Sequence, residues 1–278
     1  MNQYLAARPR TGTSLTLYCF HHAGAGASAF AGWARHVGPA FSVVPVRLPG
    51  RESRRAEAGI TEPEVLFRDL DDSLGALLEE EPYAFYGHSL GALVAHGYTD
   101  HRLAAGGRPP RALLLGACAP PHLPNGLTDD SGPTHKGDPT HEGDPTQDGD
   151  PTHDGDLTDD RLLAALRAAG GLPADLEARP GLLRSTLATT RDDLRLCRAL
   201  RERARRPVPV PVRAFAGLRD RVVAPAAVAG WQRWTTGAFR MHVLPGDHFF
   251  VREPALPRLV GQLLEPLAAA ATAVPATR

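Results

Sequence analysis

Ser89, Asp220 and His248 are the residues of this sequence whose types and order could supply a nucleophile, an orienting acid and a base. Ser89 lies in the segment Gly-His-Ser-Leu-Gly at 87–91, which matches G-x-S-x-G, the nucleophile elbow. In an elbow the serine sits on a tight turn between a strand and a helix, and the two glycines leave room for that turn. The alternative is a glycine-rich loop whose serine caps a helix. The apolar residues before the segment and the helical pattern after it favour the elbow.

Asp220 and His248 each follow a predicted strand late in the chain. Behind a nucleophile elbow the acid and the histidine come in this order, each on a loop directly after a strand. Alone, Asp220 could be a turn aspartate and His248 a packed or capping histidine. Together with Ser89 they predict a Ser-Asp-His triad for two-step acyl transfer. Asp193 is the next acid to test if Asp220 does not orient His248.

A loop of small residues at 21–28 follows the first predicted strand. Small residues let a backbone approach another group closely. In hydrolases with an elbow, one oxyanion donor is the N–H of the residue after the nucleophile, and the other comes from an early loop of this type. These rules predict the backbone N–H groups of Leu90 and Ala23 as the oxyanion hole.

The sequence predicts neither a bound cofactor nor a metal site. The 21–28 loop lacks G-x-x-x-x-G-K-[ST] and has no lysine, which argues against a phosphate loop. His21 and His22 are adjacent, and adjacent side chains on an extended chain point apart, which argues against a shared metal ion.

Alternating strands and helices must position these residues. Apolar segments predict strands at 14–20, 41–46, 83–86, 111–118, 210–217 and 239–244. Pro45 indicates an edge position or an irregularity for the second strand. Between the strands, Thr61 and Glu64 fit a capping box at the start of a helix. The buried face of this helix is predicted at positions 66, 70, 74 and 77, all leucine. This alternation of strands and helices predicts an α/β protein with a doubly wound, mostly parallel sheet that binds its ligand at the carboxyl ends of the strands.

Residues 119–206 are predicted to form a helical lid inserted into a core made of residues 1–118 and 207–278. The lid segment holds two amphipathic patterns and no strand, and Thr158 fits the N-cap of its first helix. An apolar lid over a serine implies an acyl-type substrate.

Within the lid segment, residues 131–157 carry a six-residue repeat in four copies, such as Thr-His-Glu-Gly-Asp-Pro. From 131 to 156 no residue is aliphatic, aromatic, Cys or Met, and seven acidic residues against one lysine give a charge of about −6. Such a segment has no apolar surface to bury and is predicted to be a low-complexity surface insertion. Metal capture by its histidines and aspartates is not favoured, because no rigid scaffold would order the ligands.

The composition narrows the function class. The chain has 278 residues, with 31 Lys plus Arg and 31 Asp plus Glu, and this balance argues against nucleic-acid binding and electrostatic membrane binding. Cys19, Cys118 and Cys197 are widely spaced, which indicates buried thiols in a reducing compartment. No signal peptide and no apolar run of ~20 residues is found. We expect a cytoplasmic monomer.

The chain resembles the type II thioesterases that accompany polyketide synthases and nonribosomal peptide synthetases, within the α/β-hydrolases. The resemblance is carried by pieces in family order along nearly the whole chain, at 22–24, 48–54, 87–92, 157–159, 170–171, 191–193, 231–236 and 245–250. Leu-Pro-Gly-Arg-Glu-Ser-Arg at 48–54 and Pro-Gly-Asp-His-Phe-Phe at 245–250 are its most specific pieces. The hexapeptide insertion and Arg221, directly after the predicted acid, depart from the family pattern.

The resemblance implies hydrolysis of acyl groups from the phosphopantetheine arm of an acyl or peptidyl carrier protein, which clears stalled or wrong units. A small-molecule carboxylesterase, a lipase-like hydrolase or an acyltransferase would use the same triad, because a fold does not select a substrate. A non-catalytic carrier-protein binder is a third class, and the intact Ser-Asp-His set argues against it.

Overall fold

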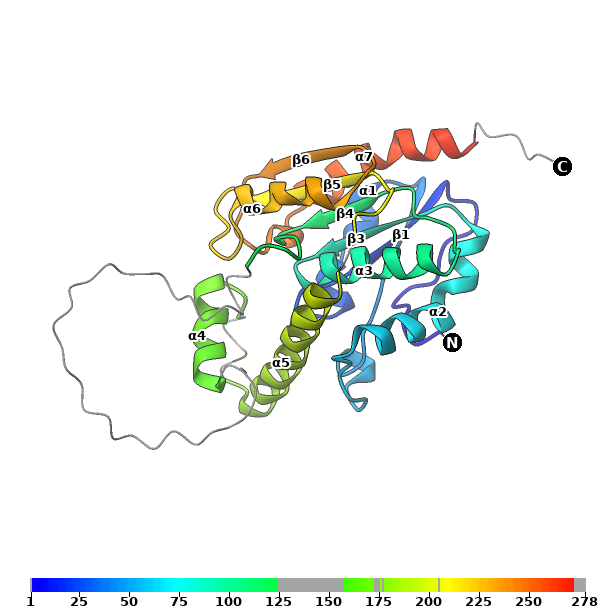
Figure 1. The fold of residues 1–278 in the computed structure, drawn as a ribbon. Coiled ribbons are helices and arrows are strands. Elements are labelled where there is room, and N and C mark those ends of the chain that lie inside the picture. Colours follow the sequence, from blue (N-terminus) through cyan, green and yellow to red (C-terminus); the bar gives the residue numbers. More distant parts are fainter. Residues whose placement is uncertain (1, 125–157, 173–175, 177, 205, 273–278) are drawn as a thin grey trace, which may run out of the picture.

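The computed structural model describes residues 2–124, 158–172, 176, 178–204 and 206–272 (Figure 1). Its centre is a six-stranded sheet in the order β2-β1-β3-β4-β5-β6, and every neighbouring pair is parallel. The strands are β1 (Leu15–Phe20), β2 (Phe41–Pro45), β3 (Tyr83–His88), β4 (Leu113–Gly116), β5 (Val212–Gly217) and β6 (Phe239–Leu244). The predicted α/β class with a doubly wound, mostly parallel sheet is confirmed. Pro45 lies on an edge strand, as expected, where a missing N–H costs no ladder bond inside the sheet.

Side chains of the central strands alternate between two hydrophobic clusters, one on each face of the sheet. In β1, Tyr18 and Phe20 belong to one cluster and Leu17 and Cys19 to the other. Because both faces are covered, β1 and β3 are buried along their whole length, as expected for parallel strands between two helical layers.

The helices divide between these faces (Figure 1). The Tyr18 face packs against helices α2 (Pro63–Glu80), α3 (Leu90–Ala104) and α5 (Pro180–Arg203). The opposite face packs against α1 (Trp33–Val37) and α7 (Ala255–Thr272). Helix α4 (Asp159–Ala169) lies beside α5, away from the sheet, and α6 (Pro225–Ala229) follows β5.

Two local expectations for α2 were wrong. The helix begins at Pro63 after Glu62, with no side-chain cap, and not after Thr61. Proline at the first helical position has a preset φ and no N–H that needs a cap, so the start lies one residue later than the capping box predicted. The residue that follows Leu74 on the buried face is Leu78 and not Leu77. In an α-helix, residues four positions apart lie on the same face.

Other local expectations are confirmed. The Thr158 hydroxyl caps α4 by accepting from the N–H of Arg161 at 3.4 Å. All three cysteines are buried and free. The repeat at 131–157 lies outside the described residues. None of the helices in the described ranges combines the length and the apolar character that a membrane crossing requires.

The strand order places a crevice at the carboxyl ends of β1 and β3. The chain leaves β1 toward β2 on one side and leaves β3 toward β4 on the other, so the strand order reverses between these neighbours. Loops that diverge from such a switch point open a crevice where α/β proteins bind ligands. The residues after β1 and β3 include Ala23 and Ser89, respectively.

Candidate active site

Ser89 lies on a strained turn between β3 and α3. Its φ of 54° and ψ of −115° are unusual for a residue with a side chain. Its N–H donates to the carbonyl of Gly116 at 2.8 Å, and its own carbonyl accepts from Ala92 at 2.9 Å. Flanking bonds of this kind hold the turn in a conformation that the isolated peptide would avoid.

Both elbow glycines are sterically required. A Cβ on Gly87 would lie 2.1 Å from the carbonyl oxygen of Gly91, and a Cβ on Gly91 would lie 2.1 Å from that of Phe20. The second contact joins the start of α3 to the end of β1. The elbow is therefore tight for two reasons: the turn itself and the neighbouring strand.

Asp220 and His248 meet across the loops that follow β5 and β6. The Nδ1–H of His248 donates to Oδ2 of Asp220 at 2.9 Å, and the two side chains are 4% and 0% exposed. Oδ1 of Asp220 accepts from the backbone N–H groups of Val222 and Val223 at 2.8 and 2.9 Å. Burial acts to raise the pKa of Asp220, but the hydrogen bond and charge of His248 and the two backbone donors hold it below its ordinary value. Asp220 is thus an ionised carboxylate that fixes one tautomer of His248.

A second histidine holds the backbone of the first. The Nε2–H of His88 donates to the carbonyl of His248 at 2.8 Å, and its Nδ1 accepts from the hydroxyl of Tyr86 at 2.8 Å. Burial, helped by the charge of His248, lowers the pKa of His88 to about 3, so the ring is neutral. No sequence signal pairs His88 with a backbone group 160 residues away, so its part in the site could not be predicted from the sequence.

Ser89 and His248 line one small cavity, which we call the acyl cavity. Its volume is about 30 Å³, and the predicted oxyanion residue Ala23 lines it too. The rest of its wall is mostly apolar and comes from both helices of the lid segment and the loop after β6: Leu162, Leu166, Ala169, Thr190, Leu194 and Phe249. This volume suits about one water molecule, so an acyl chain needs part of this wall to move.

Leu90, the other predicted oxyanion residue, is the first residue of α3. Backbone N–H groups of a first helical turn have no partner within the helix, and the helix dipole favours negative charge there. The structure therefore brings Ser89, His248 and Ala23 to one cavity, places Leu90 next to Ser89, and joins Asp220 to His248.

A buried ion pair that the sequence analysis missed fixes the loop containing Ala23. Both oxygens of Asp193, on α5, bind the guanidinium of Arg51 at 2.8 and 2.9 Å, with side chains 2% and 7% exposed. Oδ2 of Asp193 also accepts from the N–H of Gly24 at 2.8 Å. Arg51 donates to the carbonyl of Ala25 at 2.9 Å. Asp193, the alternative acid, is thus bound to Arg51, and it occupies the N–H of Gly24.

The described residues contain no group of three or more His, Cys, Asp or Glu side chains that could hold a metal ion. Two nearby buried histidines, His21 and His22, follow β1. Burial lowers the pKa of both, to about 4 for His21 and well below the ordinary value for His22. A neutral pair of this kind adds no positive charge beside the site.

Known proteins match this chain along most of its length. The family model described as thioesterase domain matches residues 15–265. Linear gramicidin dehydrogenase LgrE of Brevibacillus parabrevis is 30% identical over 84% of this chain and 81% of its own length. The solved structure of RedJ, a thioesterase from the prodiginine biosynthetic pathway in Streptomyces coelicolor, has a TM-score of 0.74 at 32% identity and covers 93% of both chains. BorB, a type II thioesterase from the borrelidin biosynthetic cluster, has a TM-score of 0.72 at 28% identity and covers 94% of this chain and 95% of its own.

Proposed function

This chain belongs to the thioesterase family, and we propose that it hydrolyses acyl thioesters on the phosphopantetheine arm of acyl or peptidyl carrier proteins. The observation that carries the proposal is the hydrogen-bonded Asp220–His248 pair beside a cavity that Ser89 also lines. The relatives named for type II thioesterases and for biosynthetic pathways support the carrier-protein substrate. In this role the enzyme would clear stalled or wrong acyl groups from a biosynthetic assembly line.

In the first step, Nε2 of His248 takes the hydroxyl proton of Ser89 while Oγ attacks the thioester carbonyl carbon. Asp220 keeps Nδ1 protonated and stabilises the imidazolium. The N–H groups of Ala23 and Leu90 bind the oxyanion, and the occupied N–H of Gly24 leaves Ala23 as the donor from this loop. The carbon–sulfur bond then breaks, and the leaving thiolate takes the proton from His248.

In the second step, His248 takes a proton from a water molecule that attacks the acyl-serine carbonyl. The ester bond to Ser89 breaks, Oγ recovers the proton from His248, and the free acid leaves. Each step thus ends with neutral His248 and ionised Asp220.

We propose that residues 119–206 form the lid, with residues 1–118 and 207–278 as the core, and that movement belongs to α4. Helix α5 is fixed to the core by Asp193, which binds Arg51 and the N–H of Gly24, and by Leu196, Cys197 and Leu200, which belong to the hydrophobic cluster on the Tyr18 face of the sheet. Helix α4 buries a single residue, Leu162. An acyl chain would enter the closed cavity by displacing α4.

A dinucleotide-dependent reaction, which the name of the gramicidin relative invites, is not supported by the loop after β1. Gly24, Gly26 and Ala29 have the spacing of a dinucleotide fingerprint, whose glycine-rich turn leads into a helix that binds the pyrophosphate. Here Asp193 occupies the N–H of Gly24, Glu52 occupies that of Ser28 at 2.9 Å, and only a four-residue 3₁₀ helix follows.

The proposal is tested by incubating the enzyme with an acyl carrier protein, an acyl-CoA and an acyl phenyl ester of the same chain, and by measuring free acid and the acyl-serine mass. We expect the highest kcat/KM with the carrier protein and an acyl adduct on Ser89. Ser89→Ala should bind the carrier protein and lose hydrolysis by about 10⁶. Preference for the phenyl ester would favour a carboxylesterase, and an unlabelled Ser89 would contradict the mechanism.

A further inference from the structure

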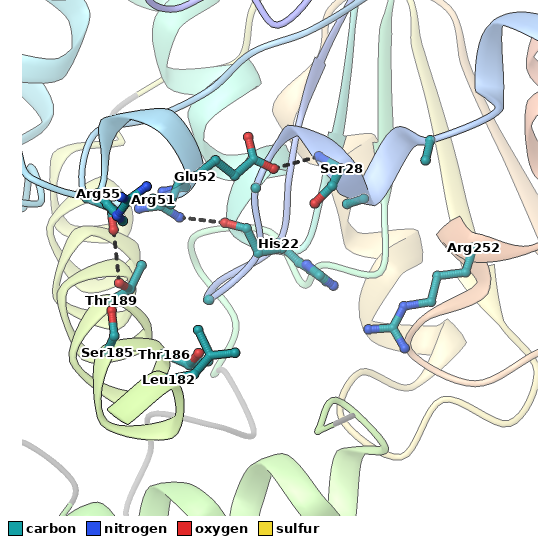
Figure 2. A pocket seen from close by; sticks show the side chains of 16 residues that line it. His22, Ser28, Arg51, Glu52, Arg55, Leu182, Ser185, Thr186, Thr189 and Arg252 are labelled. Carbon is teal, nitrogen blue, oxygen red and sulfur yellow. Dashed lines mark hydrogen bonds between the residues drawn. The ribbon is translucent and has the colours of Figure 1, made fainter. Parts of the chain in front are cut away.

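A second, larger cavity of about 720 Å³ lies on the other side of the loop that follows β1; we call it the polar cavity (Figure 2). Small residues of that loop, the 50–55 loop, one face of α5 and Arg252 line it. Its volume falls in the range of binding sites for small molecules and cofactors. His22 lines both the polar cavity and the acyl cavity, so the two cavities adjoin at this residue.

His22 offers unmet hydrogen-bonding capacity at this junction. Its side chain is 7% exposed, and neither ring nitrogen has a hydrogen-bond partner among the described residues. Its ring packs edge-on against that of Phe249, with centroids 5.1 Å apart, and Phe249 lies in the same way against His248 at 5.2 Å. Because a buried polar group without a partner is costly, His22 is suited to bind a polar group of a ligand that passes from one cavity to the other.

Two of the arginines that line the polar cavity have no acidic partner among the described residues and can therefore bind an anionic ligand. Arg51 is neutralised by Asp193, and Glu52 by Arg47 at 2.9 Å. Among the described residues, neither Arg55 nor Arg252 has a carboxylate within ion-pair distance. Figure 2 shows the Arg252 side chain reaching toward the cavity from the side opposite Arg51 and Arg55. The cavity therefore favours an anionic ligand.

The Arg252 side chain is also positioned by the active-site loop. Its guanidinium lies 4.6 Å from the centroid of the Phe249 ring, a cation–π contact, and Phe249 lines the acyl cavity. On the facing wall, α5 contributes the hydroxyls of Ser185 and Thr186 and the apolar side chain of Leu182, which is 50% exposed. The wall thus offers hydrogen-bonding groups, one apolar contact and positive charge.

From these observations we infer that the polar cavity binds the phosphopantetheine portion of the thioester substrate, with the sulfur end at His22 and the phosphate in the positive field of Arg55 and Arg252. Phosphopantetheine matches the wall: it has two amides and a hydroxyl, a gem-dimethyl group that Leu182 can contact, and an anionic phosphate. The inference rests on the proposed function and adds to it the residues that recognise the arm.

The test compares four thioesters of one acyl group: on N-acetylcysteamine, on pantetheine, on 4′-phosphopantetheine and on a carrier protein, with the acyl-CoA as a fifth substrate. The variants are Arg55→Gln, Arg252→Gln and their double, and the control is Arg258→Gln, an exposed arginine of α7. We expect kcat/KM for acyl-phosphopantetheine to fall about threefold in each single variant and about tenfold in the double. With acyl-pantetheine and acyl-N-acetylcysteamine it should stay within about twofold of the wild-type value.

A steric variant tests the cavity without changing its charge. Ser185→Trp, an exposed position on the α5 wall, should raise KM for acyl-pantetheine and acyl-phosphopantetheine about tenfold and leave the short N-acetylcysteamine thioester unchanged. Ala188→Trp, at an exposed α5 position that lines neither cavity, is its control and should behave as the wild type.

The outcomes separate this inference from the proposed function. Equal losses with and without the phosphate, or no loss in any variant, would overturn the inference while hydrolysis by the wild type still upheld the function. A loss confined to the carrier protein would also overturn it, because the arginines would then contact the protein surface. A larger loss with acyl-CoA than with the carrier protein would identify CoA as the source of the arm, and the reverse would identify the carrier protein. No wild-type hydrolysis of any thioester would refute the function itself.

Discussion

Two buried carboxylates on opposite sides of the crevice hold two different kinds of partner. Asp220 holds His248, whose ring can gain and lose a proton, and Asp193 holds Arg51, whose guanidinium stays charged. Both carboxylates also accept backbone N–H groups, from Val222 and Val223 in one case and from Gly24 in the other. Similar burial and hydrogen bonding thus serve proton transfer at one site and backbone positioning at the other.

Of the variants that test these different roles of Asp220 and Asp193, Asp220→Asn should have the largest effect. The amide keeps the size of the side chain but no longer fixes the tautomer of His248 or stabilises its charged form, so kcat should fall on the order of 10⁴ while the fold is retained. Steady-state kinetics and circular dichroism would measure both. Asp247→Asn, next to His248 but bonded to the N–H of Phe249, is the control and should change kcat by less than about twofold. Near-normal activity in Asp220→Asn would show that another group orients His248.

Asp193→Asn should have the next largest effect. It leaves the buried Arg51 charge unpaired, which should cost about 3 kcal/mol of stability, and it loosens the loop that carries Ala23, which should lower kcat about 10- to 100-fold. Urea unfolding and kinetics measure the two effects, and the pH dependence of kcat/KM should keep its shape because the Asp220–His248 pair is intact.

The double variant Asp193→Asn/Arg51→Met separates stability from positioning. Removing the unpaired charge should restore part of the stability, but kcat should stay low because the loop still lacks its tie to α5. Full kcat in either variant would mean that this ion pair stabilises the fold without positioning the loop.

Acid stability probes the His248 side through His88, the neutral buried histidine that holds the backbone of His248. The folded pKa of His88 is about 3, below the ordinary value of 6.5, so the unfolded chain binds a proton that the folded chain does not as pH falls below 6.5. The contribution of His88 to stability is therefore complete above pH 6.5 and declines as pH falls toward 3. At pH 5 the loss should be about 2 kcal/mol.

His88→Gln provides the measurement for this effect. Glutamine does not titrate and can still bond both Tyr86 and the His248 carbonyl. Between pH 7 and pH 5, the free energy of unfolding of the His88→Gln variant should decrease by about 2 kcal/mol less than that of the wild type. Parallel curves for the two proteins would mean that His88 is not the group that titrates.

The smallest effect is expected from an exposed carboxylate–arginine pair, which joins α4 to α5. Asp159 binds Arg191 at 2.5 Å, and its side chain is 60% exposed. Because exposed ion pairs contribute at most about 1 kcal/mol, Asp159→Asn should change the unfolding free energy by less than that and KM by less than about threefold. A change in kcat as large as that in Asp193→Asn would show that α4 is positioned as firmly as α5.

Local sequence was sufficient to predict the nucleophile elbow and the order of strands along the chain. It also predicted that Asp220 and His248 lie on loops directly after strands. Glycines at a tight turn, apolar periodicity and loops after strands are set by sterics and hydrophobic burial over a few residues. Where neighbouring signals competed, the local prediction was wrong by one position: with Pro63 as the first helical residue of α2, the N-cap is Glu62 and not Thr61, and Leu78 replaces Leu77 on the buried face.

Tertiary structure alone decided which distant groups meet. Arg51 and Asp193 are 142 residues apart, and His88 and the carbonyl of His248 are 160 apart; no periodicity or motif links either pair. The acyl cavity and the polar cavity meet at His22 because α5 and the loop after β6 pack over the loop after β1, which is also a tertiary contact. The sequence alone determined which residues stand on the crevice, because the turn after each strand is a local property. Which of these crevice residues contact each other depends on the order of the strands in the sheet and on how the helices and loops pack over it. Contacts between distant segments of the chain are set only by that packing.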